Sequence, residues 1–134
     1  NDVQRVRAAG VDFIVSPGCT PRLHQAAEAS GLPFLAGAVT ASEAMAMQEL
    51  GYTRLKYFPA DANGGAAGLK GLGGPLPGLS FCPTGGVGGK NAAEYLAAPN
   101  CFAVGGSWVA PADAIRSGDW KRIEDLARKA SNLV

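Results

Sequence analysis

The chain has 134 residues, with 12 Lys and Arg against 11 Asp and Glu and 47% apolar residues, which is the size and composition of one folded domain. A net charge of +1 offers no broad cationic surface to nucleic acid or to an anionic membrane, and no apolar run approaches the ~18 residues of a membrane span. Three cysteines spaced 63 and 19 residues apart provide neither a disulfide framework nor a C-x-x-C pair. We therefore expect no metal site, and we expect the protein to reside in the reducing cytoplasm.

Short apolar runs alternate with helical segments along the chain, which is the pattern of βα repeats around a parallel sheet. A helix is predicted first, over residues 2–9. Five strands are predicted over residues 12–16, 33–37, 54–59, 79–83 and 101–105.

The helices between these strands have recognisable ends. Thr20 and Thr40 are predicted N-caps, the second in a capping box with Glu43, and Gly31 and Gly51 stop the two helices. Further helices are predicted after residue 63, over 91–97, and after the N-cap Asp119, where Trp120, Ile123, Leu126 and Ala127 share one face.

The predicted strands begin every 21 to 25 residues, so the units form either an open flavodoxin-like sheet or part of a (β/α)8 barrel. The glycine-rich turns decide between them, because an open sheet places its phosphate-binding turn after the first strand. Here such turns follow the last two strands, as they do after strands 7 and 8 of a barrel. Residues 1–134 are therefore predicted to be one domain, strands 4–8 of the barrel, with roughly 66 residues before Asn1.

Two glycine pairs at consecutive strand ends predict a phosphate cradle, because backbone amides reach an anion where no Cβ intervenes. Thr84 and Ser107 could each add a hydroxyl donor. The alternative is that these glycines form tight turns without a ligand. The pairs lie in Thr84-Gly85-Gly86 and Gly105-Gly106-Ser107.

Lys56 is the one lysine inside a predicted strand, among large apolar residues. Because side chains alternate, Leu55 and Tyr57 face one side while Lys56 and Phe58 face the other. If helices cover the first side, Lys56 points into the barrel. Burial disfavours the ammonium form, so the amine could attack a carbonyl and form a Schiff base. The alternatives are a lysine that reaches the barrel mouth and one paired with a carboxylate.

Other polar residues have structural interpretations. Asp61 is expected to be a turn or capping carboxylate, and His24 a surface side chain. Cys82 and Cys101 are expected to act as small apolar residues in core strands.

Several stretches follow one another in a distinctive order. They are Ile14 to Gly18, Gly37 to Glu43, Leu55-Lys56-Tyr57-Phe58-Pro59-Ala60, Asn63-Gly64-Gly65, Phe81-Cys82-Pro83-Thr84-Gly85-Gly86-Val87 and Gly105-Gly106-Ser107-Trp108. In this order and spacing the chain resembles the 2-keto-3-deoxy-6-phosphogluconate (KDPG) aldolase family over essentially its whole length.

The resemblance implies a class I aldolase, a lyase that cleaves KDPG to pyruvate and glyceraldehyde 3-phosphate in the Entner–Doudoroff pathway, with 4-hydroxy-2-oxoglutarate as a second candidate substrate. It implies a (β/α)8 barrel, a homotrimer when full length, and no metal or organic cofactor. The residues it implies are Lys56 for the Schiff base, Gly85, Gly86, Gly106 and Ser107 for phosphate, and Pro17, Phe58 and Thr84 for lining the substrate site.

Two departures limit the resemblance. Ala36 and Ala41 stand where the family often has prolines, and the second departure is more serious. The family has a proton-shuttling glutamate on its second strand and a substrate-binding arginine close after it, and both positions would precede Asn1. We therefore expect the 134-residue chain alone to be impaired. A phosphosugar isomerase or epimerase without a covalent intermediate, and a non-catalytic fragment, remain as alternatives.

Overall fold

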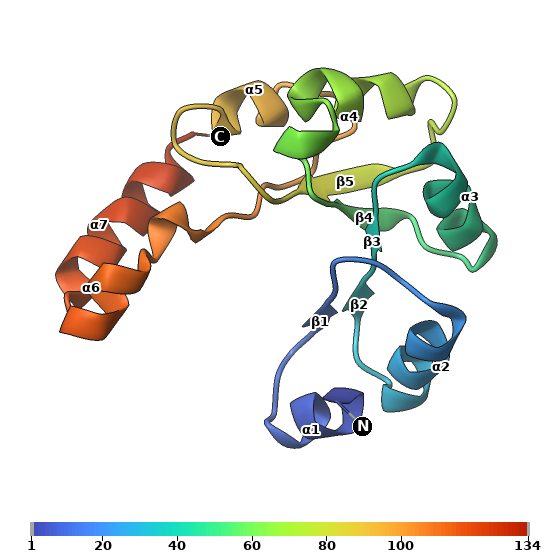
Figure 1. Ribbon diagram of the computed structural model, residues 1–134, viewed down its shortest axis with the longest axis horizontal. Coiled ribbons are helices and arrows are strands. Elements are labelled where there is room, and N and C mark those ends of the chain that lie inside the picture. The colour runs from blue at the N-terminus through green and yellow to red at the C-terminus, as the bar shows by residue number, and fades with distance from the viewer. Residues whose placement is uncertain (1, 134) are drawn as a thin grey trace.

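The computed structural model describes residues 2–133 and shows an α/β protein in which helices flank parallel strands (Figure 1). The strands are β1 (Ile14–Val15), β2 (Phe34–Leu35), β3 (Gly37–Ala38), β4 (Arg54–Tyr57) and β5 (Ser80–Pro83). The α-helices are α1 (Asp2–Ala8), α2 (Pro21–Ser30), α3 (Ala41–Glu49), α4 (Gly65–Gly73), α5 (Ala92–Leu96), α6 (Ala112–Ser117) and α7 (Trp120–Ser131), and η1 (Asp61–Asn63) and η2 (Ser107–Val109) are 3₁₀ turns. Within residues 2–133, no helix combines the length and apolarity needed to cross a bilayer.

All strand pairs are parallel, and neighbours in sequence are neighbours in space. β1 pairs with β2, β3 with β4, and β4 with β5. Ala36, between β2 and β3, accepts a hydrogen bond from the amide of Lys56 (N···O 2.8 Å), so β4 runs beside both short strands. Two isolated parallel bridges add residues 101–105 on the side of β5 away from β4. This order lacks the reversal that a flavodoxin-like sheet has after its first strand, so that alternative does not describe the chain.

The predicted caps on α2 and α3 are present. The Thr20 hydroxyl accepts a hydrogen bond from an amide in the first turn of α2, and Gly31 ends the helix with φ +70°. Thr40 and Glu43 form both halves of a capping box at α3. Hydrogen bonds from the amides of Val39 and Thr40 hold the pKa of Glu43 below its usual value, because they stabilise the carboxylate.

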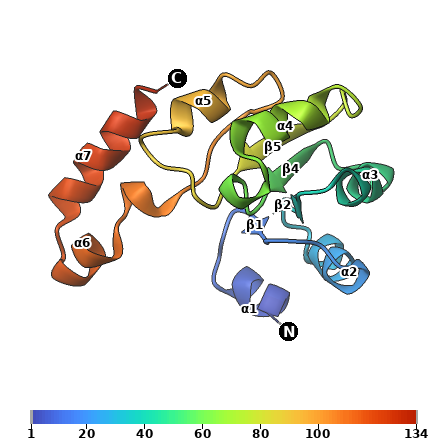
Figure 2. The same cartoon turned by 45° about the horizontal axis from the view of Figure 1, so that its top comes forward.

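One face of the strands forms the core. Leu55 and Tyr57 of β4 and Phe81 of β5 are at most 2% exposed, and the rings of Tyr57 and Phe81 meet edge to face at 6.2 Å. Leu69 of α4 and Tyr95 of α5 are buried with them. α4 and α5 therefore cover this face of the sheet (Figures 1 and 2).

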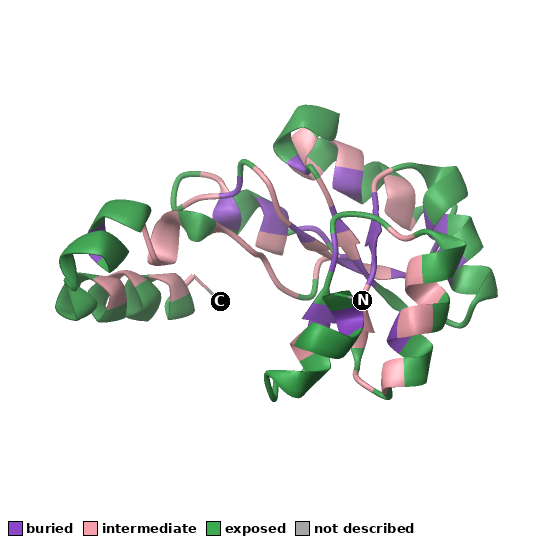
Figure 3. Cartoon of the chain, turned by 60° about the horizontal axis from the view of Figure 1, so that its bottom comes forward, coloured by how far each residue is buried: buried purple, intermediate pink, exposed green. Residues whose placement is uncertain are grey.

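The other face is open where it carries large apolar side chains. Phe13 is 59% exposed and Phe102 is 40% exposed. Both line one hollow together with Phe34, Leu35 and Arg54. Figure 3 shows buried residues gathered on the central strands and on the helix faces turned toward them. Exposed apolar surface of this kind is typical of faces that bind a protein segment, a membrane or a ligand.

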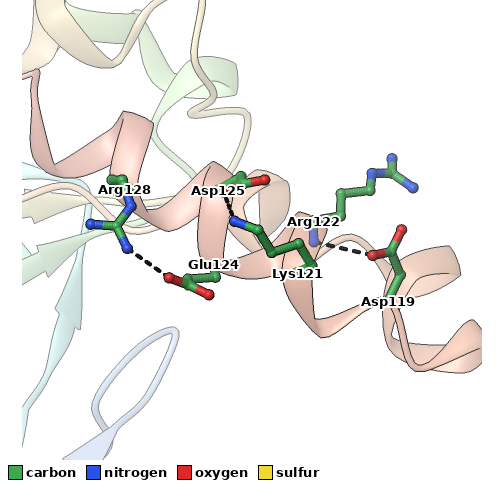
Figure 4. Close-up of polar contacts among 6 residues, drawn as sticks. All are labelled: Asp119, Lys121, Arg122, Glu124, Asp125 and Arg128. Atoms are coloured by element: carbon green, nitrogen blue, oxygen red, sulfur yellow. Dashed lines mark hydrogen bonds and ion pairs between the residues drawn. The ribbon is translucent and has the colours of Figure 1, made fainter.

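α7 lies apart from the sheet and packs on η2 and α6. Asp119 caps it by accepting a hydrogen bond from the amide of Arg122 (3.1 Å). On the helix face predicted to carry Trp120, Ile123 and Leu126, the last two side chains are half-buried, whereas Trp120 is 65% exposed. The short helix α6 was not predicted. Two ion pairs lie along α7, each joining residues four positions apart (Figure 4). They are Lys121–Asp125 at 2.5 Å and Glu124–Arg128 at 2.6 Å.

The capping box gives a test of the local structure. Replacing Thr40 with alanine should lower the free energy of unfolding by about 1 kcal/mol, because an amide of α3 loses its acceptor. Ser42→Ala is the matched control. This residue lies two positions later, in α3, and is exposed, so its replacement should change stability little. Urea unfolding of the variants measures both, and equal effects would argue against the cap.

Candidate active site

Lys56 lies in the middle of β4, opposite the helix-covered face. Its Cα partners are Gly37 in β3 and Cys82 in β5. Because Leu55 and Tyr57 are buried under the helices, the alternation of the strand turns Lys56 to the other side, as the sequence predicts. The side chain is half-buried, not fully enclosed.

An aromatic ring faces the lysine amine. Nζ of Lys56 lies over the Phe58 ring, 4.5 Å from its centroid. Phe58 is itself half-buried. It is the first residue after β4, and the peptide bond between it and Pro59 is cis. The ring face carries negative potential, so this contact attracts a positive charge on the nitrogen.

Cys82 occupies the neighbouring position on β5. Burial raises the pKa of its thiol, while a hydrogen bond with Thr84 and the positive charge of Lys56 act in the opposite direction. The protonated thiol is therefore favoured at neutral pH, and a thiol is a poor nucleophile. Cys82 and Cys101 are both half-buried free cysteines, in keeping with the expected packing role.

Pro17 lies in the loop after β1, directly against Gly37 of β3. A Cβ atom on Gly37 would overlap the Pro17 carbonyl oxygen, so the loop crosses directly against the residue paired with Lys56. The Ser16 hydroxyl donates a hydrogen bond to the Gly18 carbonyl, which helps to hold the loop. The glycine at 37 is what permits this close approach.

The two predicted glycine pairs lie side by side. Thr84 bridges to Gly105, and Gly85 and Gly86 have φ of +92° and +80°, a region that glycine adopts without strain. A Cβ atom on Gly106 would come within 2.6 Å of the Val87 carbonyl oxygen, which brings the second pair against the turn after the first.

Backbone amides are available at this turn. In the described part of the chain, no residue accepts a hydrogen bond from the amides of Gly86, Gly106 or Ser107. Successive amides of this kind form concave sites for anions.

Phe58 joins the lysine to the glycine-rich turns. The chain after β4 stays paired with the chain after β5, because the Ala60 amide donates to Thr84 (2.8 Å). A Cβ atom on Gly85 would lie 3.0 Å from the Phe58 ring. The carboxyl ends of β4, β5 and residues 101–105 thus bring together the amine, the ring and the glycine pairs.

His24 lies elsewhere, and its predicted surface position is wrong. Its side chain is 12% exposed, with Nδ1 3.0 Å from the Tyr52 hydroxyl and Nε2 3.5 Å from Glu28. This cluster ties α2 to the turn before β4. Asp61 opens η1, as expected for a turn carboxylate, and packs against Gly86. Among residues 2–133, no three His, Cys, Asp or Glu side chains are grouped to hold a metal ion.

Known proteins match this sequence and this arrangement. The family model for KDPG and KHG aldolase matches residues 1–126. The 2-dehydro-3-deoxy-phosphogluconate aldolases of Pseudoalteromonas atlantica and Pseudomonas aeruginosa are 47% and 48% identical over 93% and 91% of the chain. The chain belongs to the KDPG and KHG aldolase family. It spans 58% and 56% of the length of these two relatives.

Solved structures of KDPG aldolases are similar to this chain in fold and in sequence. KDPG aldolase from Legionella pneumophila, with pyruvate captured as a covalent carbinolamine intermediate, is 42% identical with a TM-score of 0.91, covering 95% of this chain and 62% of that one. The enzyme of Zymomonas mobilis ZM4 with 3-phosphoglycerate is 38% identical with a TM-score of 0.90, covering 98% and 62%.

The close packing at Gly106 can be tested. Gly106→Ala would drive a methyl group into the Trp108 ring and the Val87 carbonyl, and overpacking of this kind costs about 1–3 kcal/mol of unfolding free energy. Gly71→Ala in α4 is the matched control, since its added methyl meets nothing within 4 Å. A helical Gly→Ala change there should stabilise by up to about 1 kcal/mol. Urea unfolding separates the two, and a fully stable Gly106→Ala protein would contradict the packing described.

Proposed function

We propose that this chain carries the Schiff-base centre of a class I aldolase, a lyase that cleaves KDPG to pyruvate and glyceraldehyde 3-phosphate. The observation that carries the proposal is the half-buried Lys56 amine, beside Phe58 and the adjoining glycine pairs. It lies on the face of β4 opposite α4 and α5, which is the inner face of the proposed barrel. The relatives that bear the KDPG aldolase name support the substrate. The covalent pyruvate adduct of the Legionella protein supports the chemistry.

The proposed architecture is the part of a (β/α)8 barrel that holds strands 4–8, with residues 1–134 forming one portion of a single domain. Three observations support it. The parallel strands follow sequence order, the inner face exposes Phe13 and Phe102, and the chain spans about three fifths of its relatives. Strands 1–3 would cover this inner face.

In the proposed mechanism, the unprotonated Lys56 amine adds to the C2 ketone and forms a carbinolamine. The carbinolamine hydroxyl takes up a proton and leaves as water, which gives a protonated imine. A base then removes the proton of the C4 hydroxyl, the C3–C4 bond breaks, and its electron pair passes to the imine nitrogen as an enamine forms. Glyceraldehyde 3-phosphate leaves, the enamine takes a proton at C3, and water releases pyruvate and the free amine.

The glycine-rich turns would hold the phosphate. Gly85, Gly86, Gly106 and Ser107 supply the proposed backbone contacts, and none of these four amides has an acceptor within the described residues. Pro17, Phe58 and Thr84 would line the substrate. Fixing the distal phosphate orients the C2 carbonyl toward Lys56 and removes much of the entropic cost of reaction.

The same centre accommodates 4-hydroxy-2-oxoglutarate as a second substrate, because Schiff-base chemistry needs the 2-keto acid and not the phosphate. The family description names both KDPG and KHG. We also propose a homotrimer for the full-length protein, acting in the Entner–Doudoroff pathway of the cytoplasm without a metal or organic cofactor. Three free cysteines are compatible with a reducing compartment.

Trapping tests the Schiff base directly. The complete protein, incubated with pyruvate and borohydride, should carry a reduced adduct that peptide mass spectrometry locates on Lys56. Lys56→Met should lose the adduct and lower kcat/KM for KDPG more than about a thousandfold, because the nucleophile is gone. Lys70→Met, at an exposed position in α4, is the control and should behave as wild type.

An unmodified Lys56 in an otherwise active protein would overturn the proposal. Conversion of a phosphosugar without any adduct and without pyruvate release would favour an isomerase or epimerase instead.

The 134-residue chain alone should turn over KDPG at least about 100-fold more slowly than a full-length relative, because the proton-transferring base would come from strands 1–3 of the proposed barrel. Pyruvate release coupled to lactate dehydrogenase measures the rate. Equal rates would show that residues 1–134 contain a complete catalytic set.

A further inference from the structure

The Phe58 ring has an orientation that lining a substrate site does not require. Any apolar side chain could line such a site, yet the face of this ring, and not its edge, is turned to Nζ of Lys56 at 4.5 Å. An aromatic face attracts a cation more strongly than a neutral amine.

The backbone holds this ring in place independently of the lysine. Gly85 backs the ring so closely that a Cβ atom there would lie 3.0 Å from Cε2 and 3.1 Å from Cδ2 of Phe58. Hydrogen bonds from the amides of Ala60 and Asp61 to Thr84 and Gly85 (2.8 and 3.0 Å) clamp the chain on both sides. The ring is therefore preorganised next to the nitrogen.

We propose that the Phe58 ring face keeps the imine formed on Lys56 protonated during C–C cleavage. This inference rests on the proposed aldolase function and assigns Phe58 an electrostatic role in addition to lining the site. Only the protonated imine is a good electron sink; the neutral imine accepts the electron pair of the C3–C4 bond poorly. Gly37 and Cys82 are the other residues next to Lys56 along the sheet. Gly37 has no side chain, and burial raises the pKa of the Cys82 thiol, so neither supplies a negative charge at neutral pH.

The role has a distinctive consequence for pH dependence. The alkaline limb of kcat reports ionisations of the enzyme–substrate complex, and deprotonation of the imine ends turnover there. A cation–π contact at a partly buried site corresponds to a shift of about half to one pH unit in that limb. A residue that acts by shape alone lowers kcat equally at every pH.

The experiment is a fluorination series at position 58 of the complete protein. Site-specific incorporation of mono-, di- and trifluorophenylalanine weakens the negative potential of the ring face with little change of shape. The alkaline limb of kcat for KDPG should move to lower pH with each fluorine. Phe58→Tyr should leave the limb in place and Phe58→Leu should move it as far as the most fluorinated ring.

Phe102 provides the matched control. Its ring also lies under a cation, Arg54, at 5.2 Å, but in the hollow of the inner face and not beside Lys56. Fluorination at 102 should leave the limb unchanged.

The outcomes separate the two proposals. A limb that stays fixed across the position-58 series, with the pyruvate adduct still trapped on Lys56, overturns the role of the ring alone. Absence of the adduct in the unsubstituted protein overturns the aldolase function as well.

Discussion

The two-residue period of β4 is the constraint on which the site depends. Helices α4 and α5 bury Leu55 and Tyr57 on one face of the strand, and the pleat then leaves no choice about where Lys56 points. A slip of one residue in the pairing with β5 would bury an amine under the helices and expose a tyrosine and a leucine. The apolar packing of the helix-covered face therefore fixes Lys56 on the opposite face of the strand.

Local signals in the sequence predicted most of the elements. Each predicted strand coincides with an observed strand or bridge, and the caps at Thr20, Thr40 and Asp119 form as expected, because capping involves residues three positions apart. The break at Ala36 between β2 and β3 and the burial of His24 were not predictable in this way. His24 meets Tyr52, 28 residues later, and only the assembled fold brings them together. Helix α6 did carry a signal, since it follows Pro111 and ends at Gly118.

The candidate site divides along the same line. Glycines at 85, 86 and 106 are visible in the sequence, but what approaches each of them is not. The structure shows that Gly85 admits the Phe58 ring, Gly106 admits Trp108, and Gly37 admits the Pro17 loop. The sequence shows only that a glycine lacks a Cβ atom. Which group packs into the space left by that atom is known only from the structure. The family resemblance predicts that Phe58 lines the substrate site, whereas the contact between its ring face and the Lys56 amine is seen only in the structure.

In the proposed barrel, the half-buried state of Lys56 and the exposure of Phe13 and Phe102 would have one physical explanation. All three residues lie on the face that the proposed strands 1–3 would cover, so closure that buries the apolar side chains would also remove water from the amine. Exclusion of water strengthens every charge interaction inside a site, including the contact between the Lys56 nitrogen and the Phe58 ring. The hydrophobic completion of the fold and the electrostatics of the proposed chemistry would then be coupled. A protein that closes this face would gain stability and reactivity from the same contacts.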